Sequence, residues 1–466
     1  MDLSLGRIKS ILNHLKNPQD SLKVVHVSGT NGKGSTIAYI SSILLAANYV
    51  VGEFTSPYLR YPHDSIRINK IPISTEVYNF ARGEVRRVET LLDVELTPFE
   101  RLTVIAFLVF SSAKANIDIC LIEAGLGGLN DATNVFSKPI LSVITSVSMD
   151  HEREIGPTLK DIARNEAGII KPNVDVILAI QDSSDIYQAI YDLAEQVHSG
   201  SIFEVEDKMV ELGAFGKVVN ITFPHVLKGL DDIGVTWAAY HTPFKVKPGL
   251  GTSRIQQENL SVALTTVAHL FRMHFRNKLT IETVRRGIQS ARWPGRLDQL
   301  TIMLNSTQSL SILLDGSHNE DGVFQLSEYI QSVYRLMKHK QTLDKLVWVI
   351  AFSSSKNYAK LLELFKFKSK DRIICTQFTT PVVEMPWIHA VSPEKVKEKV
   401  EMIYSNSLTA YSESNFQSAM IRAAKFAIDA ETTKQTTQVI VCGSLYLVAD
   451  IYREYVPDDR HDFVAK

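Results

Sequence analysis

Short hydrophobic runs alternate with segments of helical period along most of the chain. The runs predict strands at 22–27, 49–54, 117–122, 140–147 and 174–180. The segments between them predict helices at 36–47, 76–92 and 99–114. Strands that are apolar on both faces and are separated by helices indicate an α/β fold with a mainly parallel, doubly wound sheet.

A second series of the same kind begins after Trp293-Pro294-Gly295. It predicts strands at 311–314, 345–352, 372–375 and 438–441, and helices at 321–337 and 393–404. Residues 202–242 alternate over shorter segments, typical of antiparallel strands at a sheet edge or in a small subdomain, while 338–342 and 411–415 read as surface connections. We therefore expect two domains, residues 1–295 and a smaller α/β domain at 296–466.

Composition narrows the class of protein. The 466 residues are 45% hydrophobic and 22% charged with a net charge of −1, so no overall positive field is available to gather nucleic acid or an anionic membrane. The amphipathic N-terminus and the short apolar run at 102–110 predict neither a secretory signal nor a membrane span. Three widely separated cysteines suggest reduced thiols in the cytoplasm. They are Cys120, Cys375 and Cys442.

The most informative segment runs from Val24 to Thr36. An apolar strand leads into a turn with three glycines and one lysine, Lys33, followed by Ser35 and a helical segment. Glycines let the backbone approach a polyphosphate closely, and a helix N-terminus favours an anion. The spacing departs from the strict phosphate-loop pattern because Val27 stands at the first glycine position. A nucleotide loop is the favoured interpretation, and a merely structural turn is the alternative.

Two further candidates follow predicted strands. Glu123 ends the run 117–122, and His151 follows the run 140–147. A carboxylate at the C-terminal end of a parallel strand beside a phosphate loop can hold Mg²⁺. The alternatives are a hydrogen-bonded strand terminus for Glu123 and a satisfied surface or core residue for His151.

Several segments in the same order resemble the folylpolyglutamate synthase and dihydrofolate synthase family of Mur-ligase-like, ATP-dependent amide ligases. They are SGTNGKGS at 28–35, TSPYL at 55–59, TPFE at 97–100, EAGLGGLNDATN at 123–134, Asp150-His151, TLKDIARNEAGIIK at 158–171, WPGRL at 293–297 and LDGSHN at 314–319. The resemblance implies a Mur-ligase-like ATP-binding domain at 1–295 and a C-terminal ligase domain. It also implies that ATP drives amide formation between a folate-type carboxylate and L-glutamate through an acyl phosphate.

The resemblance also assigns residues. Catalytic roles fall to Lys33, Glu123 and His151. The Mg²⁺ ligands would be Ser56, Glu123 and His151, and the pterin contacts would be Thr97, Phe99 and Asp131. Phe99 has core packing as its alternative. The ATP contacts would be Gly29, Thr30, Asn31, Gly32, Lys33, Gly34, Ser35, Asn259, Arg296, Asp315 and His318.

Within the family, Asn31, Ala132 and segments such as Asp64-Ser65-Ile66 are most similar to fungal monofunctional dihydrofolate synthases. We expect that activity, with dihydropteroate and L-glutamate as substrates and a monomeric enzyme. A folylpolyglutamate synthase, alone or bifunctional, is the second interpretation. A non-catalytic paralogue is the third, because Tyr58, Leu129 and Ile255 depart from the family pattern; a Mur-type cell-wall ligase is disfavoured by TPFE and DATN.

Glu166 is a further departure. The family has a lysine at this position, commonly carbamylated near the second metal, so Glu166 supplies a carboxylate on a side chain shorter by about 4 Å. One hypothesis is that Glu166 acts on the metal through a water. The other is that it is a solvated helix residue and that the second metal is weakened or lost.

Overall fold

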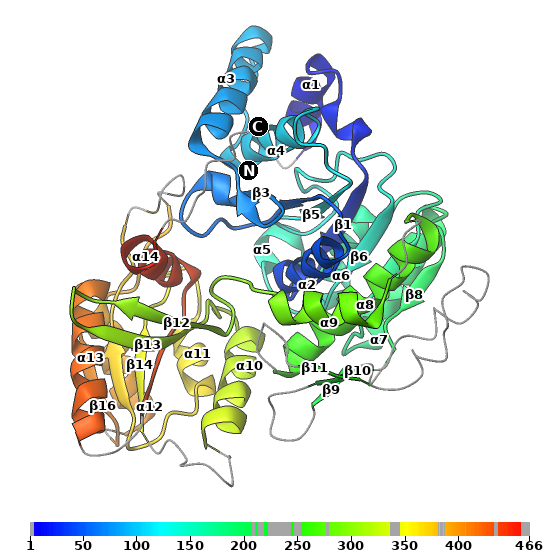
Figure 1. Ribbon diagram of the computed structural model, residues 1–466. Helices are drawn as coiled ribbons and strands as arrows, with labels where there is room; N and C mark the ends of the chain where they lie inside the picture. The colour runs from blue at the N-terminus through cyan, green and yellow to red at the C-terminus, as the bar shows by residue number, and fades with distance from the viewer. Residues whose placement is uncertain are drawn as a thin grey trace.

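The computed structural model describes residues 4–206, 210–212, 219–221, 244–246, 253–275, 279–335, 345–380, 382, 385, 387–405, 407–432 and 437–457. Figure 1 shows two α/β bodies side by side, one drawn in blue to green and the other in yellow-green to red. The chain passes between them after α9 (Ile281–Ser290) and before β12 (Asp298–Met303). Within the described residues, no helix is both long and apolar enough to cross a membrane.

The N-terminal body is built on a sheet whose described strands confirm the predicted mainly parallel arrangement. Among the described strands only β3 runs opposite to the others, and it pairs antiparallel with both β2 and the edge strand β4. In spatial order the strands are β4 (Ile71–Pro72), β3 (Ile66–Ile68), β2 (Val51–Phe54), β5 (Ile119–Glu123), β1 (Val24–Ser28), β6 (Leu141–Ile144), β7 (Val176–Leu178) and β8 (Ile202–Glu204). In the β1–β5 register Val27 pairs with Glu123, and β1 pairs with β6 up to Ser28 and Ile144. The C-terminal ends of β1, β5 and β6 therefore meet at one edge of the sheet.

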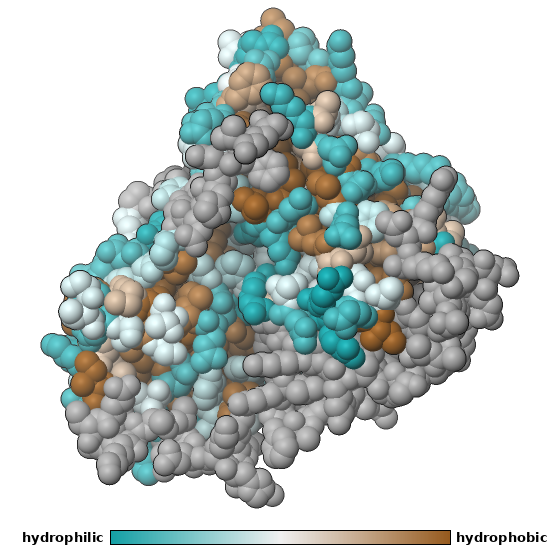
Figure 2. Space-filling model, viewed as in Figure 1, coloured by the Kyte–Doolittle hydropathy of each residue, from teal (hydrophilic) through white to brown (hydrophobic). Residues whose placement is uncertain are grey.

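Helices cover both faces of this sheet, as the alternation of strand side chains requires. Val25 and Val27 of β1 pack under α2 (Lys33–Ala46), α8 (Arg254–Met273) and α9, whereas Val24 packs with α1 (Gly6–His14), α3 (Thr75–Leu92) and α4 (Pro98–Phe110). Beside β6 and β7 lie α6 (Leu159–Glu166) and α7 (Ser184–Gln196). The outer surface over α9 is mainly hydrophilic (Figure 2), consistent with its exposed Glu282 and Arg286.

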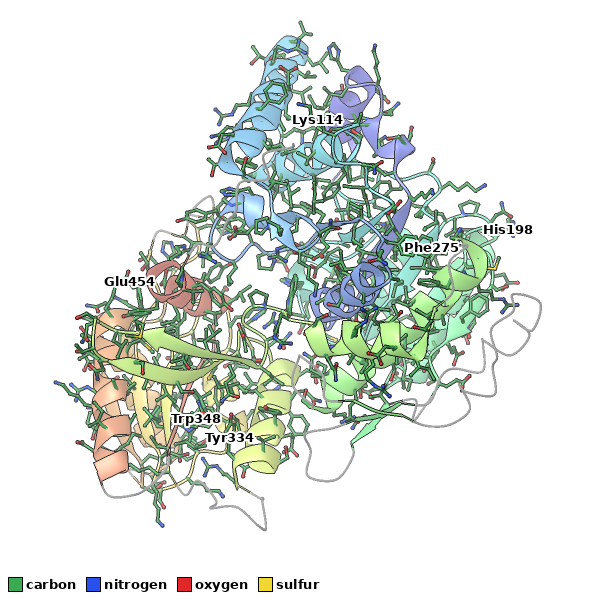
Figure 3. The ribbon with its side chains drawn as sticks, viewed as in Figure 1. Lys114, His198, Phe275, Tyr334, Trp348 and Glu454 are labelled. Carbon is green, nitrogen blue, oxygen red and sulfur yellow. The ribbon has the colours of Figure 1, made fainter. Side chains whose placement is uncertain are left out.

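The C-terminal body has its own sheet, in which only β12 runs antiparallel among the described strands. Its order is β12, β13 (Ser309–Leu314), β17 (Gln438–Cys442), β14 (Leu346–Ile350), β15 (Arg372–Cys375) and β16 (Thr409–Ser412). One face carries α10 (Glu320–Ile330), α11 (Tyr358–Leu364) and α12 (Pro393–Ile403), and the other carries α13 (Phe416–Thr432) and α14 (Leu445–Tyr455). Trp348 of β14 is fully buried inside this body (Figure 3).

Three expectations need correction. Residues 411–412 belong to β16 rather than to a surface connection, because a polar edge strand lacks the apolar run that marks a buried one. Residues 202–204 form β8, which is parallel to β7, whereas β9 (Val210–Leu212), β10 (Val219–Ile221) and β11 (Phe244–Val246) are antiparallel as predicted. The hairpin strand β12 was not predicted, since its outer residues are exposed. Residues 222–242 and 338–342 lie outside the described residues.

Candidate active site

The glycine turn lies between β1 and α2, at the edge of the sheet where β5 and β6 also end. Gly32 precedes α2 with φ +89°, and any side chain there would collide with the amide of Asn259 on α8. The Thr30 and Asn31 N–H groups donate to the Ser146 carbonyl at 2.9 and 3.2 Å, which fixes the loop against β6. No side chain caps α2, so the N–H groups of its first turn remain available to an anion.

Lys33 is folded back over this loop. Its ammonium donates to the Gly29 carbonyl at 2.5 Å and lies 3.4 Å from the Thr30 carbonyl. No carboxylate among the described residues forms an ion pair with it. The positive charge is therefore held at the loop by neutral acceptors, which an anionic ligand can replace.

Glu123 lies where β5 ends and is 4% exposed. One carboxylate oxygen accepts a hydrogen bond from the Ser56 N–H at 3.0 Å. Burial raises the pKa of Glu123 to about 7. Three cations act in the opposite direction, and they are Lys33, Arg296 and Arg67. The sheet thus brings a buried carboxylate and a hydroxyl-bearing residue, Ser56, beside the phosphate loop.

Asp150 and His151 follow β6 on the same side of the sheet. His151 is exposed and adopts a left-handed backbone conformation, φ 53°, immediately before α5 (Glu152–Ile155). Asp150 forms an ion pair with Lys356 of the C-terminal body at 3.0 Å and accepts a hydrogen bond from Asn319 at 3.1 Å. Although burial acts to raise it, the pKa of Asp150 is held well below its usual range by His151 and Lys356. Asp150 is therefore a charged bridge between the two bodies.

Asn31 makes a second bridge from the phosphate loop itself. Its amide nitrogen donates to Asp321 at 3.1 Å, and its oxygen accepts from Asn319 at 3.2 Å. Asn319 also caps α10 by accepting from the Gly322 N–H at 2.9 Å. The start of α10 is therefore positioned directly against the loop that the sequence predicts to bind phosphates.

The C-terminal body places three more predicted residues at the cleft. Asp315 is buried and accepts hydrogen bonds from the Leu297 and Ser317 N–H groups, both at 2.9 Å. His318 lies 2.8 Å from the Gly316 carbonyl through Nδ1, so Nδ1 carries the proton and Nε2 is free to accept. Desolvation and the nearby Arg296 lower the pKa of His318 to about 4, which keeps the ring neutral at pH 7.

Two adjoining hollows lie between the bodies, with about 570 and 940 Å³ of open space. The smaller hollow has Ile255 and Asn259 of α8 on one side and Gln325 and Leu326 of α10 on the other. The larger is lined by the phosphate loop together with Ser56, Arg67, Glu123, Asp150, His151, Trp293, Arg296 and His318. The structure thus brings together most of the residues that the sequence assigned to ATP and Mg²⁺.

The three predicted pterin contacts lie beside the cleft and do not line either hollow. Thr97 caps α4, and Phe99 stacks on Phe54 with ring centres 5.9 Å apart. Both carboxylate oxygens of Asp131 are occupied, because they accept from the N–H groups of Gly125, Leu126 and Thr133 at 2.9 Å. Phe99 packs against Gly125, which lines the larger hollow. Ligand contact by these three residues stays a prediction.

Glu166 is 3% exposed at the end of α6, so the interpretation as a solvated helix residue is wrong. Its carboxylate accepts from the Gly29 N–H at 2.9 Å, and its main-chain carbonyl accepts from the Ser28 hydroxyl at 2.8 Å. Burial raises the pKa of Glu166, and Lys33 acts against this. Glu166 therefore contacts the start of the phosphate loop, which the local sequence did not indicate.

Comparisons with known proteins agree with this geometry. Residues 298–454 match the family described as "Dihydrofolate synthetase, C-terminal domain". The chain is 32% identical to the probable dihydrofolate synthetase of Schizosaccharomyces pombe, over 97% of this chain and 98% of that protein. It is 31% identical to the dihydrofolate synthetase of Saccharomyces cerevisiae, over 97% and 98%. The chain belongs to the dihydrofolate synthase/folylpolyglutamate synthase family.

Solved structures of this family share the fold. The Mycobacterium tuberculosis folylpolyglutamate synthase complexed with ADP and AMPPCP superposes with a TM-score of 0.78 at 22% identity, covering 97% of this chain and 95% of that one. The Escherichia coli FolC in complex with DHPP and ADP superposes with a TM-score of 0.71 at 23% identity, covering 97% and 93%. The α/β class and the second, smaller sheet predicted from the sequence are confirmed.

Several residues at this family site were not assigned from the sequence. Asn319 and Asp321 reach the phosphate loop from the C-terminal body, and Lys356 from the same body pairs with Asp150. Arg67 and Trp293 line the larger hollow. Asn319 and Trp293 lie within the motifs LDGSHN and WPGRL, which was the only available signal. Nothing in the local pattern distinguishes Arg67, Asp321 or Lys356 from surface residues.

Proposed function

We propose that the protein is a dihydrofolate synthase. In this reaction ATP drives the joining of L-glutamate to dihydropteroate, giving dihydrofolate, ADP and phosphate. The supporting observation is the full-length similarity to two fungal proteins named dihydrofolate synthetase, at 32% and 31% identity, against 26% for the probable folylpolyglutamate synthase of S. cerevisiae.

ATP would lie across both hollows. The open N–H groups of the first turn of α2 and the ammonium of Lys33 suit its phosphates. Arg296 adds a third positive element from the C-terminal body. The apolar and amide side chains of Ile255, Asn259, Gln325 and Leu326 suit the nucleoside end. The relatives solved with ADP support this assignment.

The residues present fit Mg²⁺. Glu123 and Ser56 offer the oxygen donors that Mg²⁺ prefers, and His151 adds an imidazole on the same side of the sheet. Within the described residues no group of three His, Cys, Asp or Glu side chains gathers, so phosphate oxygens and waters would complete the shell, as is usual for Mg²⁺. When bound, the ion supplies charge neutralisation for phosphoryl transfer.

In this reaction the protein positions the reactants and offsets the negative charge of the phosphates. The acceptor carboxylate attacks the γ-phosphorus; the new O–P bond forms as the bond to ADP breaks. The glutamate amine then attacks the acyl carbon, the C–N bond forms, phosphate leaves and the ammonium proton is released. Lys33 can leave the Gly29 carbonyl for the phosphates, and Asp150 and Asn31 hold the two bodies together around the reactants.

We also propose the coarser features that accompany this function. The change of sheet after α9 and the start of the family match at residue 298 support a domain boundary near Gly295. All three cysteines are free and buried, which supports a cytoplasmic enzyme. Both walls of the cleft come from one chain, which supports a monomer.

The test is phosphate release from ATP and L-glutamate with dihydropteroate, tetrahydrofolate monoglutamate or a UDP-muramyl peptide as acceptor. We expect turnover with dihydropteroate and a clearly lower kcat/KM with tetrahydrofolate monoglutamate. Equal or better use of tetrahydrofolate monoglutamate would favour the polyglutamate enzyme. Release with none of the acceptors would favour a non-catalytic paralogue.

A further inference from the structure

Arg67 is a half-buried cation that lines the larger hollow. It lies on β3, opposite Glu53 of β2 in the sheet register. Among the described residues, none accepts a hydrogen bond or forms an ion pair with its guanidinium, although the side chain lines the hollow together with Glu123 and Lys33. Because Arg67 lines the hollow, an anionic ligand there can accept hydrogen bonds from its guanidinium. The arrangement therefore points to a ligand that supplies the acceptor.

Trp293 fixes the position of this guanidinium relative to the phosphate loop. The guanidinium carbon of Arg67 lies 5.0 Å from the centre of the Trp293 ring. The indole of Trp293 also packs against the first turn of α2. A Cβ added at Gly34 would lie only 2.6 Å from the indole ring. A stacked guanidinium keeps its edge N–H groups free and can offer two parallel donors to a carboxylate. Arg67 is thus pre-positioned for a planar anion.

In the reaction proposed above the cleft has to hold several anionic groups, which are the phosphates of ATP, the carboxylate that attacks them and the carboxylates of L-glutamate. Lys33, Arg296 and the N-terminus of α2 suit the phosphates, and Lys356 is already paired with Asp150. Arg67 comes instead from β3, opposite Glu53 of β2, and its side chain lines the larger hollow beside Glu123 and Lys33. A carboxylate bound by Arg67 would therefore lie next to the phosphate loop.

We propose that Arg67, held by Trp293, binds the reacting carboxylate of the acceptor substrate and orients it toward the phosphate loop. The inference rests on the proposed function and adds a binding residue to it. One carboxylate oxygen is held by the guanidinium edge, and the other attacks phosphorus. The L-glutamate carboxylates and the nucleotide phosphates are the alternative anions, and the experiment separates them.

The experiment compares binding of dihydropteroate with that of its carboxamide analogue, measured by calorimetry on the full chain with ADP and Mg²⁺ present. In the parent protein we expect the acid to bind at least 10-fold more tightly than the amide. In Arg67→Ala this preference should fall to about 2-fold or less, while amide binding stays nearly unchanged. Arg67→Lys, which keeps the charge without the planar fork, should be intermediate. Arg87→Ala, which removes an exposed arginine on α3, is the control and should match the parent.

Steady-state kinetics complete the test. Arg67→Ala should raise the KM for dihydropteroate about 10-fold or more and leave the KM values for ATP and L-glutamate within 2-fold. A change confined to glutamate or to ATP would overturn the assignment, and so would an unchanged preference for the acid. Equal weakening of acid and amide would show a merely structural role and would also overturn it. If the parent protein binds neither pteroate compound, it is the proposed function that fails.

Discussion

Buried carboxylates occur in both bodies of the molecule, and their surroundings differ. Asp371 in the C-terminal body is 0% exposed and accepts from Arg335 at 2.6 Å, from the Trp348 indole at 3.2 Å and from the Leu346 N–H at 3.1 Å. Glu123 and Glu166 in the N-terminal body are nearly as buried, but among the described residues each side chain accepts one hydrogen bond, from a backbone N–H at 3.0 and 2.9 Å. Burial raises the pKa of both glutamates.

The difference separates a structural charge from a functional one. Several donors and an ion-pair partner compensate Asp371 within the fold, so this carboxylate needs no ligand. The carboxylates of the two glutamates have fewer donors among the described residues, and they lie beside a loop and cleft suited to anions and cations. A buried carboxylate with too few donors therefore marks a site where binding provides the missing partner.

The largest effect should come from removing the compensated charge. Asp371→Ala leaves Arg335 buried without its partner, so we expect a loss of about 3–5 kcal/mol in the free energy of unfolding. Urea unfolding followed by far-UV circular dichroism measures this loss. Glu328→Ala is the control. It removes the exposed ion pair between Glu328 on α10 and Lys366, so it should lower the free energy of unfolding by less than about 1 kcal/mol. A loss below 1 kcal/mol in Asp371→Ala would contradict the comparison.

The second largest effect should be on kcat, with the free energy of unfolding unchanged. Lys33→Ala should lower kcat about 100-fold or more, roughly 2.7 kcal/mol, because it removes the charge nearest the phosphates in the transition state. Its urea unfolding curve should match that of the parent. Lys160→Ala, an exposed lysine on α6, is the control and should keep full activity. Retention of more than a tenth of the parent kcat in Lys33→Ala would count against the assigned role.

A smaller effect is expected at Glu166. Glu166→Gln keeps an oxygen to accept from Gly29 but removes the charge, so kcat should fall several-fold and the Mg²⁺ concentration needed for half-maximal rate should rise. Added bicarbonate should not change the parent rate. Glu152→Gln, on the exposed start of α5, should behave as the parent. If Glu166→Gln leaves the Mg²⁺ dependence unchanged, the carboxylate only positions the loop.

The smallest effect is a pH dependence at His318. Its pKa is lowered from 6.5 to about 4 in the folded protein, so the neutral ring stabilises the fold above pH 6.5 and this contribution is lost as the pH falls toward 4. Between pH 7 and pH 6 the loss should be below about 1 kcal/mol. Imidazole NMR signals should show His318 neutral from pH 5 to 8. His318→Gln should lessen the acid loss, and a ring that titrates near pH 6.5 would refute the assignment.

The sequence alone predicted the layout of both sheets with small errors at the strand ends. The predicted strand 372–375 coincides with β15, and 117–122 differs from β5 by two residues at its start and one at its end. Apolar period identifies such strands because burial on both faces requires it. It did not identify β12 or β16, whose outer residues are exposed or polar. The glycine turn and the strand-end positions of Glu123 and His151 were also readable, since the C-terminal ends of parallel strands share one edge.

Tertiary structure decided which of these residues have partners. Nothing in the local sequence places Glu166 under Gly29, brings Asn31 to Asp321, or places Arg67 against Trp293. These contacts join residues that are 137, 290 and more than two hundred positions apart, across elements whose packing depends on the whole core. Periodicity records which face of an element is buried, because burial depends on local alternation. The partner of a polar group depends on how separate elements meet, and only the folded chain determines that.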